Sequence, residues 1–336
     1  VKEPGTYCVP AGTTTINITI DSNDVVIVGE TPDATIEGSI VINSGKMNVV
    51  LRSFRITGWS ENPAVKDEGA HQLLIDGVTF DDDDGTGQGQ SAPAILVSGA
   101  AYQPEVRNCT FRMTRTDQAV IELRGGMNAK IHDNRVIGSS TPAPSSFVFV
   151  ADNVNYNGLE VYNNTANMLG CFLDVGKDGS LTNSVIRDNT ATIYSSHGIN
   201  VSDGANVEIR GNKLTVGWAD ETDALIYVAG TNVTVAGNTL DARLGLKAGG
   251  GVIVTAGTNT TISGNNVLAT KNSPAIRIAQ GGLNAIVENN EITGVVDPFI
   301  ADGKGAAIYV KEINAQVRGN RIIGVEGANA HGVFLA

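Results

Sequence analysis

Apolar and polar residues alternate over short segments along the whole chain, and these segments recur. Residues 207–216, "VEIRGNKLTV", are two alternating runs on either side of a Gly-Asn pair. The phrase returns as "VTVAGNTL" at 233–240, "TTISGNNV" at 260–267 and "AQVRGNRI" at 315–322. Alternation with period two is typical of β-strands, and a hairpin would need its partner strand next instead of another copy of the phrase. The pattern predicts a β-repeat and excludes a helical one.

Alignment of the repeats places one asparagine from each in a single column. The column spacing is 23 to 31 residues, with Cys109, Val78 and Phe54 in the same slot upstream. Such a period is typical of a solenoid, in which each unit buries its apolar face only against its neighbours. We expect the column to form an internal ladder of side-chain amides that bond from coil to coil. Its members are Asn134, Asn164, Asn189, Asn212, Asn238, Asn265, Asn290 and Asn320.

A second alternating segment precedes each of these phrases, for example "AVIELRGG", "CFLDVGKDG" and "ALIYVAG", and most end in Gly, Asp or Asn. Each coil should therefore contain two or three short strands joined by tight corners. Equivalent strands of successive coils would pair in parallel, roughly 4.8 Å apart. The sequence predicts an all-β parallel solenoid of about 11–12 coils.

These phrases, together with "PGTYCVPAG" at 4–12 and "DVVIVGE" at 24–30, resemble the repeats of the pectate-lyase-like superfamily. The resemblance covers nearly the whole chain and implies a right-handed, single-stranded parallel β-helix. We expect one domain over 1–336, with the first coils at 1–45 and a loop insertion at 80–93. The resemblance says less about activity, because this fold carries lyases, hydrolases, epimerases, tailspikes, adhesins and inert shafts.

Composition and charge restrict the partners. The chain has 40 glycines, 17% charged residues and a formal net charge of −12, so we expect no nucleic-acid partner, which would need a basic surface. There is no apolar run of about eighteen residues, and we expect no membrane span. Cys8, Cys109 and Cys171 are too few and too scattered for a disulfide framework or a zinc site, and we expect three buried thiols.

Outward-facing residues are the candidates for function, and period two identifies them. The strand before the Asn corner has two outward positions in each coil, and these form two adjacent rows. Together the rows place six cationic or aromatic residues on neighbouring coils: Arg107, Lys130, His132, Tyr162, Arg187 and Arg210. The resemblance implies that a polysaccharide lyase would use such a mixture: a cation to neutralise a uronate carboxylate, a base to take the C5 proton and an acid to protonate the leaving oxygen. We assign catalysis to Lys130, His132, Tyr162 and Arg187, and substrate binding to Arg107 and Arg210.

A structural interpretation of this column is also open. Glu105, Glu160 and Glu208 alternate with the cations along the coils, and solvated ion-pair ladders would explain the same pattern.

A second outward column belongs to another strand of the coil. It contains Leu96, Glu122, Phe149, Asp174, Asn200, Tyr227, Ile253, Arg277, Tyr309 and Phe334. Aromatic rings spaced along a rod can stack on sugars, and Glu122 and Asp174, two coils apart, have the separation of an inverting glycosidase pair. We assign substrate binding to Glu122, Phe149, Asp174 and Tyr227. The alternative is an apolar stripe covered by loops or by another subunit.

The insertion "FDDDDGTGQGQ" at 80–90 contains four consecutive carboxylates. Asp82 and Asp84 are candidate calcium ligands, although the EF-hand template fails because its twelfth position is Pro93. A solvated acidic loop is the alternative. We expect no other cofactor.

Together these features predict an exported protein, extracellular or at the cell surface, that binds and cleaves an acidic polysaccharide by β-elimination along one face. Export is expected because the chain begins at Val1 without an initiator Met or a signal peptide. The alternative is a non-catalytic surface fibre or shaft subunit. Since the chain begins near "PGTY" and stops within the strand "GVFLA", unpaired strand edges would favour head-to-tail assembly of copies, unless the chain is cut from a longer protein.

Overall fold

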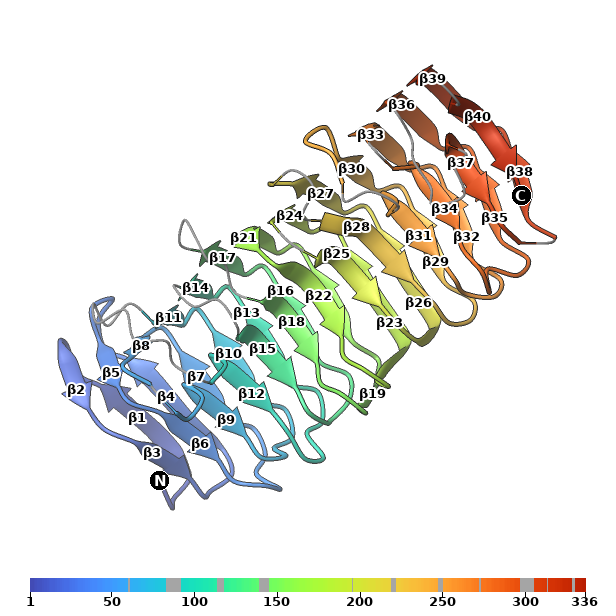
Figure 1. The fold of residues 1–336 in the computed structure, drawn as a ribbon. Helices are drawn as coiled ribbons and strands as arrows, with labels where there is room; N and C mark the ends of the chain where they lie inside the picture. Colours follow the sequence, from blue (N-terminus) through green and yellow to red (C-terminus); the bar gives the residue numbers. More distant parts are fainter. Residues whose placement is uncertain are drawn as a thin grey trace.

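The protein is an elongated rod of short strands with the chain termini at opposite ends (Figure 1). The computed structural model describes residues 1–59, 61–82, 92–113, 118–138, 145–194, 196–218, 222–246, 250–271, 273–296, 305–312, 314–327 and 330–336. Within these residues each coil contributes one strand to each of three parallel sheets, here called A, B and C. This confirms the predicted all-β parallel solenoid, and the thirteen strands along each sheet path are close to the expected coil number.

The strands are short because each spans only one side of a coil. Sheet A contains β1 (Gly5–Val9), β4 (Val25–Gly29), β7 (Val50–Arg52), β10 (Leu74–Asp76), β13 (Glu105–Arg107), β16 (Lys130–His132), β20 (Glu160–Tyr162), β23 (Ser180–Arg187), β26 (Gly204–Arg210), β29 (Thr234–Ala236), β32 (Thr261–Ser263), β35 (Ile286–Glu288) and β38 (Gln316–Arg318), with β19 (Asn155–Asn157) also paired to β23. Sheet B contains β2 (Thr13–Thr15), β5 (Thr35–Glu37), β8 (Arg55–Thr57), β11 (Thr79–Asp81), β14 (Thr110–Met113), β17 (Arg135–Gly138), β21 (Thr165–Leu169), β24 (Thr190–Ile193), β27 (Lys213–Val216), β30 (Thr239–Asp241), β33 (Asn266–Lys271), β36 (Glu291–Val296) and β39 (Arg321–Glu326). Sheet C contains β3 (Ile18–Ile20), β6 (Ile40–Ile42), β9 (Val65–Asp67), β12 (Ile95–Val97), β15 (Ala119–Leu123), β18 (Ser146–Val150), β22 (Cys171–Val175), β25 (Ser196–Val201), β28 (Thr222–Val228), β31 (Ile253–Thr255), β34 (Ile276–Ile278), β37 (Gly305–Val310) and β40 (Ala330–Leu335).

The corner between sheets A and B carries the predicted Asn ladder. Asn212 Nδ2 donates to Asn238 Oδ1 at 3.0 Å and to the carbonyl of Ile186 at 2.9 Å. The same coil-to-coil amide bond links all eight asparagines in order, from Asn134 to Asn320. The ladder is therefore confirmed. Seven of its eight side chains are buried, with Asn320 half-buried, and burial is tolerated because each amide is bonded inside the coil stack.

The residue before each ladder asparagine turns the corner in the left-handed conformation. Gly211 has φ +64°, and Asn163 and Asp188 in neighbouring coils have φ 54° and 56°. Asn, Asp and Gly are the residues that tolerate this conformation at least cost. The Gly211-Asn212 pair thus combines a turn residue with a buried amide.

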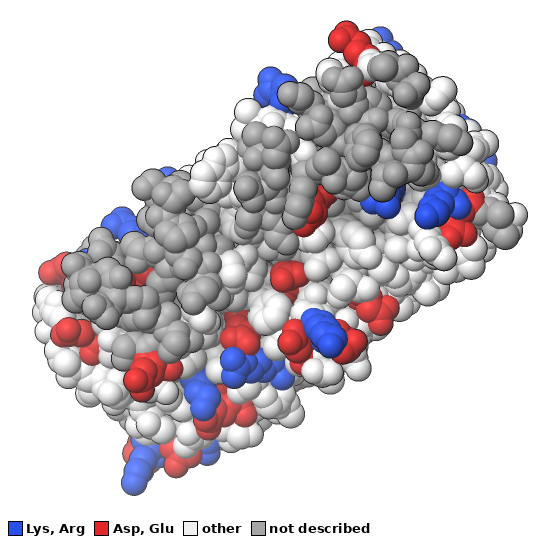
Figure 2. Space-filling model, in the orientation of Figure 1, with Lys and Arg blue, Asp and Glu red and all other residues white. Residues whose placement is uncertain are grey.

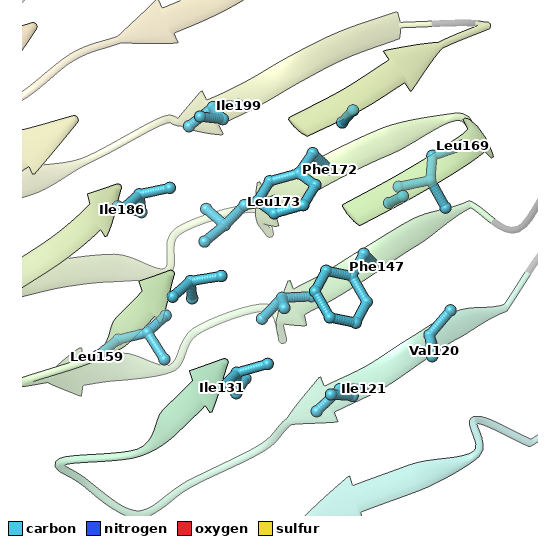
Figure 3. Close-up of a cluster of buried hydrophobic side chains, with 14 of the residues drawn as sticks. Val120, Ile121, Ile131, Phe147, Leu159, Leu169, Phe172, Leu173, Ile186 and Ile199 are labelled. Carbon is cyan, nitrogen blue, oxygen red and sulfur yellow. The ribbon is translucent and has the colours of Figure 1, made fainter. Parts of the chain in front are cut away.

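The interior is a continuous apolar core formed by the inward side chains of all three sheets (Figure 3). Aromatic rings stack within it from coil to coil: Phe80 and Phe111 lie 4.8 Å apart and nearly parallel, and Phe147 and Phe172 continue the series. Each fully buried side chain of this size contributes about 1.5–3 kcal/mol to folding. The core holds the three sheets in fixed register, and so it fixes the outward columns as well.

Two predictions about side-chain direction are wrong. Val254, and not Ile253, pairs with Tyr227 and Arg277 in the outward column of sheet C, while Ile253 points inward. Cys109 and Cys171 are buried thiols as expected, but Cys8 is exposed. Cys8 lies on β1, the first strand of sheet A, which pairs only with β4.

The described residues contain no helix long and apolar enough to cross a membrane. End-to-end assembly of copies stays a prediction.

Candidate functional site: a groove along sheet A

The outer face of sheet A brings together the cationic and aromatic residues predicted from the sequence. Its register places Lys130 next to Glu105 and Glu160 in one row. The neighbouring row contains Arg107, His132, Tyr162, Arg187 and Arg210, one residue per coil. The two predicted outward rows are thus adjacent on one sheet, and the roles assigned to these residues stay predictions.

His132, Tyr162 and Arg187 form a stack across three coils. The rings of His132 and Tyr162 are parallel, with centroids 4.5 Å apart, and the Arg187 guanidinium lies 4.2 Å from the centre of the Tyr162 ring. Partial burial, followed by the nearby Glu160 carboxylate, raises the pKa of Tyr162. The phenol therefore keeps its proton at neutral pH and can donate it.

Both ring nitrogens of His132 lie beside carboxylates. Nε2 is 3.1 Å from Glu105 Oε1, and Nδ1 is 2.7 Å from Asp133 Oδ2. The imidazole is largely buried, with 8% of the residue exposed. These contacts fix the ring against Tyr162, and a substrate that needs Nε2 must displace Glu105.

Carboxylates also accompany the cations of this face. Lys130 Nζ lies 3.7 Å from Glu160, Arg187 lies 3.0 Å from Asp188, and Arg210 lies 2.9 Å from Glu208. Arg107 contacts both Glu105 and Asp76. Figure 2 shows the same intermixing of positive and negative side chains on the face that it presents. The paired charges leave this face close to neutral. Exposed pairs of this kind contribute little to stability, so a ligand can displace them at low cost.

A groove runs along the corner where the chain enters sheet A. One hollow of about 760 Å³ is lined by the first-row residues Glu105, Lys130 and Glu160. Gln72, Gln103, Asn128 and Gly158, each two positions before its strand of sheet A, and Asn183, within β23, also line it. A second hollow of about 610 Å³ lies further along the same corner, beside β32, β35 and β38. We call the amide-bearing turn residues the amide track: Gln72, Gln103, Asn128, Asn183, Asn206, Asn232, Asn259, Asn284 and Asn314.

The amide track is a second ladder, at the surface. Asn206 donates to Asn183 at 3.1 Å, and Asn232 donates to Asn206 at 3.3 Å. The bonds continue through Asn259 to Asn284. Every member has a positive φ, between 54° and 62° for those from Gln103 onward except Asn183 at 48°. The track therefore presents a regular row of amide donors and acceptors along the groove.

Sequence reasoning missed this track, although the sequence contains it. An Asn, Gln or Gly stands six positions before each ladder slot, as Asn206 does before Asn212 and Gln103 before Cys109. These residues stand outside the alternation of apolar and polar positions, so that alternation does not mark them as a column. A Gly at 158, between Asn128 and Asn183, interrupts the amides once.

The other predicted residues lie on a different face, in sheet C. Glu122, Phe149 and Asp174 occupy successive coils, with Tyr227 two coils further on. Glu122 is 8% exposed and contacts Arg124 at 2.6 Å, while Asp174 accepts a hydrogen bond from Asn200 at 2.7 Å. The structure thus separates these residues from the groove, and Phe149 stands between the two carboxylates.

The predicted calcium ligands are only partly described. Asp82 follows β11 and is buried, whereas Asp84 lies outside the described residues. In the part of the chain that the structure describes, no group of three or more His, Cys, Asp or Glu residues could hold a metal ion. The calcium site stays a prediction.

Comparison with known families agrees with the fold and decides the family. The sequence matches the family described as the right handed beta helix region over residues 5–240 and again over 174–335. The chain belongs to this right-handed β-helix family. No curated protein sequence matches the chain.

Solved structures share the fold at low sequence identity. The A-module of a mannuronan C-5 epimerase from Azotobacter vinelandii has a TM-score of 0.60 and 12% identity, over 97% of this chain and 91% of that one. A mannuronic-acid-specific polysaccharide family 6 lyase from human gut microbiota has a TM-score of 0.54 and 12% identity, over 93% and 76%. A surface protein and adhesin from Streptococcus pneumoniae has a TM-score of 0.59 and 12% identity, over 98% and 91%. At these identities the likeness shows the fold alone.

Proposed function

We propose that this β-helix protein binds an extended polysaccharide in the groove along sheet A. The observation that carries the proposal is the 760 Å³ hollow, whose lining repeats amide and charged side chains from coil to coil. A repeating array of donors and acceptors suits a repeating polymer, since each sugar presents hydroxyls at similar intervals. Structural relatives named for action on polysaccharides support this assignment. An extracellular or cell-surface location is part of the same proposal.

A direct test is glycan retention. The purified chain should be retarded in a native gel that contains its polysaccharide, and Glu160→Gln, which alters the wall of the hollow, should weaken the retardation. Equal mobility with and without every polymer tried would oppose the proposal and favour the non-catalytic shaft or fibre.

A second candidate function is cleavage of an acidic polysaccharide by β-elimination, favoured by the protonated Tyr162 in its stack with His132 and Arg187. In this proposal Arg187 and Lys130 neutralise the uronate carboxylate and His132 takes the C5 proton. The electron pair forms the C4–C5 double bond, the C4–O bond breaks, and Tyr162 protonates the leaving oxygen. Lys130 and His132 would first have to leave Glu160 and Glu105.

This second candidate predicts an unsaturated product. Incubation with polyuronates should raise the ultraviolet absorbance, and Tyr162→Phe should abolish that rise with little change in thermal stability. Tyr194→Phe, a phenol on a different part of the coil, is the matched control and should leave the rate unchanged. A flat absorbance with the wild-type chain on a broad polyuronate panel would exclude the lyase.

A further inference from the structure

A row of exposed apolar side chains lies along the corner between sheets C and A. Met47, His71, Tyr102 and Met127 occupy equivalent positions in four successive coils and are joined by parallel bridges. Met47, Tyr102 and Met127 are 45%, 37% and 44% exposed. The rings of His71 and Tyr102 lie 6.0 Å apart. We call these four residues the apolar ridge.

The apolar ridge has a shallow hollow of its own. The hollow measures about 490 Å³ and is lined by His71, Tyr102 and Met127 together with Ala100, Ala101 and Gly126. The small residues at these positions leave the flanks of the larger side chains uncovered. A ligand with a flat apolar face could therefore pack against Tyr102 and Met127.

The apolar ridge occupies four coils at and before the 760 Å³ hollow. In the next five coils the same column contains Asn157, Thr182, Ala205, Thr231 and Thr258, which are polar or small, and an exposed apolar residue returns only at Leu283. Solvent-exposed apolar residues clustered in this way mark binding surfaces more often than isolated ones do. The repeat thus provides an internal comparison between coils with the ridge and coils without it.

The ridge and the amide track are adjacent in the chain. Each ridge residue directly precedes an amide: Met47 precedes Asn48, His71 precedes Gln72, Tyr102 precedes Gln103 and Met127 precedes Asn128. Gln72, Gln103 and Asn128 line the larger hollow. The ridge residues line the separate 490 Å³ hollow, one chain position away from these amides, so a ligand would have to extend across both hollows to contact the amides and the ridge together.

The charge of the residues that line the 760 Å³ hollow restricts the class of ligand. Its charged lining residues are Glu105, Lys130 and Glu160, two carboxylates against one ammonium group, and Lys130 already contacts Glu160. A polyuronate would bring further carboxylates to this wall and would be repelled, so an uncharged ligand in this hollow and the β-elimination candidate exclude each other. Hydroxyl groups, in contrast, donate well to carboxylates and bond with amides in both directions.

We propose that the apolar ridge is the stacking wall of the glycan groove and that the segment bound there is an uncharged polysaccharide. The inference rests on the proposed function and narrows its substrate class. A pyranose ring has an apolar C–H face, which would pack on Tyr102 and Met127, and a polar edge, which would meet Gln103 and Asn128. The rung spacing of ~4.8 Å lets consecutive ridge residues meet consecutive sugars of an extended chain.

The test measures binding of the full chain to glucomannan and mixed-linkage β-glucan, as uncharged probes, and to polygalacturonate and alginate. The uncharged polymers should bind and the polyuronates should bind at least tenfold more weakly. The double change Tyr102→Ala and Met127→Ala should weaken binding of the uncharged polymer at least tenfold, and Tyr102→Phe should retain it. The matched control, Thr231→Ala with Thr258→Ala in the same column, should bind like the wild type.

A measurement on the wild-type protein tests the same proposal without depending on whether the variants fold. Dilute peroxide should oxidise the exposed Met47 and Met127, and a bound uncharged glycan should slow this oxidation several-fold without protecting the exposed thiol of Cys8. Unchanged binding by the ridge variant, or equal oxidation with and without glycan, would show that the apolar ridge does not bind the glycan. If Asn128→Gly still weakened binding in that case, the groove itself would remain supported. Binding of polyuronates alone would overturn the uncharged ligand, and binding of no glycan would overturn the proposed function as well.

Discussion

Each ladder asparagine uses its side chain in two directions along the rod. Asn212 Oδ1 accepts from the backbone and side-chain amides of Asn189, at 3.1 Å and 2.9 Å, while its Nδ2 donates to the next coil and to the Ile186 carbonyl. Asn212 has no exposed surface. A residue without the amide would leave buried donors and acceptors unbonded on both sides.

Asn212→Ala should therefore lower the free energy of unfolding by roughly 1 to 3 kcal/mol. Asn43→Ala is the control, because Asn43 is half-buried and makes one side-chain bond, to Asp21 at 3.3 Å; it should have a much smaller effect. Urea unfolding followed by circular dichroism measures both. Equal stability of Asn212→Ala and the wild type would show that the ladder is not a source of stability.

At the scale of the element, the corner from β9 into β10 depends on a buried acid. Asp67 ends β9 and its Oδ1 accepts from the backbone N–H groups of Gly69 and Ala70, at 2.9 Å and 2.6 Å. Asp67 Oδ2 has no hydrogen-bond partner in the described structure. Burial raises the pKa of Asp67 to about 6, and the two backbone bonds offset only part of this effect.

A raised carboxyl pKa means that the fold binds the proton more tightly than the unfolded chain does. The contribution of Asp67 to stability should thus fall as the pH rises from about 4 to about 6 and stay at the lower level above that. Asp67→Asn keeps the Oδ1 acceptor without the charge, so it should stabilise the protein at pH 8 by about 1 to 3 kcal/mol, and by much less near pH 4. Asp178→Asn, at an exposed corner, should change little at either pH. Urea midpoints at both pH values measure this, and a destabilised Asp67→Asn at pH 8 would contradict it.

The strands and the Asn corner could be predicted because alternation and one repeated residue type encode them directly. The error at Ile253 has a physical cause: Val252, Ile253 and Val254 are all apolar and all buried, so period two cannot decide which of them faces outward. The amide track and the apolar ridge could not be predicted from the alternation of apolar and polar residues, for another reason. Most of these residues lie outside the strands, although Asn183 and Asn206 lie within β23 and β26. At every track amide the backbone is left-handed, so strand alternation does not give the direction of the side chain.

The cluster around Tyr162 was only half predictable. Its members could be placed on one face by register, since each coil repeats the last. The contacts of His132 with Glu105 and Asp133, and of Lys130 with Glu160, depend on rotamers and on the spacing of neighbouring coils. These ion pairs determine whether each charged side chain is available to a ligand. The alternation of apolar and polar residues does not predict them.

The whole molecule is a rod with two hollows along one corner. Parallel pairing from β1 to β38 fixes the order of sheet A, and the core fixes which side chains face outward. The hollows of 760 Å³ and 610 Å³ therefore lie on one line along the rod, connected by the amide track. A preorganised groove of this length needs little rearrangement to accept an extended polymer.

The most direct test of this account is isothermal titration of the full chain with soluble polysaccharides, compared with the double variant Gln103→Gly and Asn128→Gly. Glycine suits these positive-φ turns and already stands at 158 in the same column, so the variant should fold. Asn163→Gly, an exposed turn residue at the other corner of the coil, is the control. We expect binding that the double variant weakens at least tenfold and the control retains. Binding of equal strength in all three proteins, or no binding to any polysaccharide by the wild type, would contradict the account.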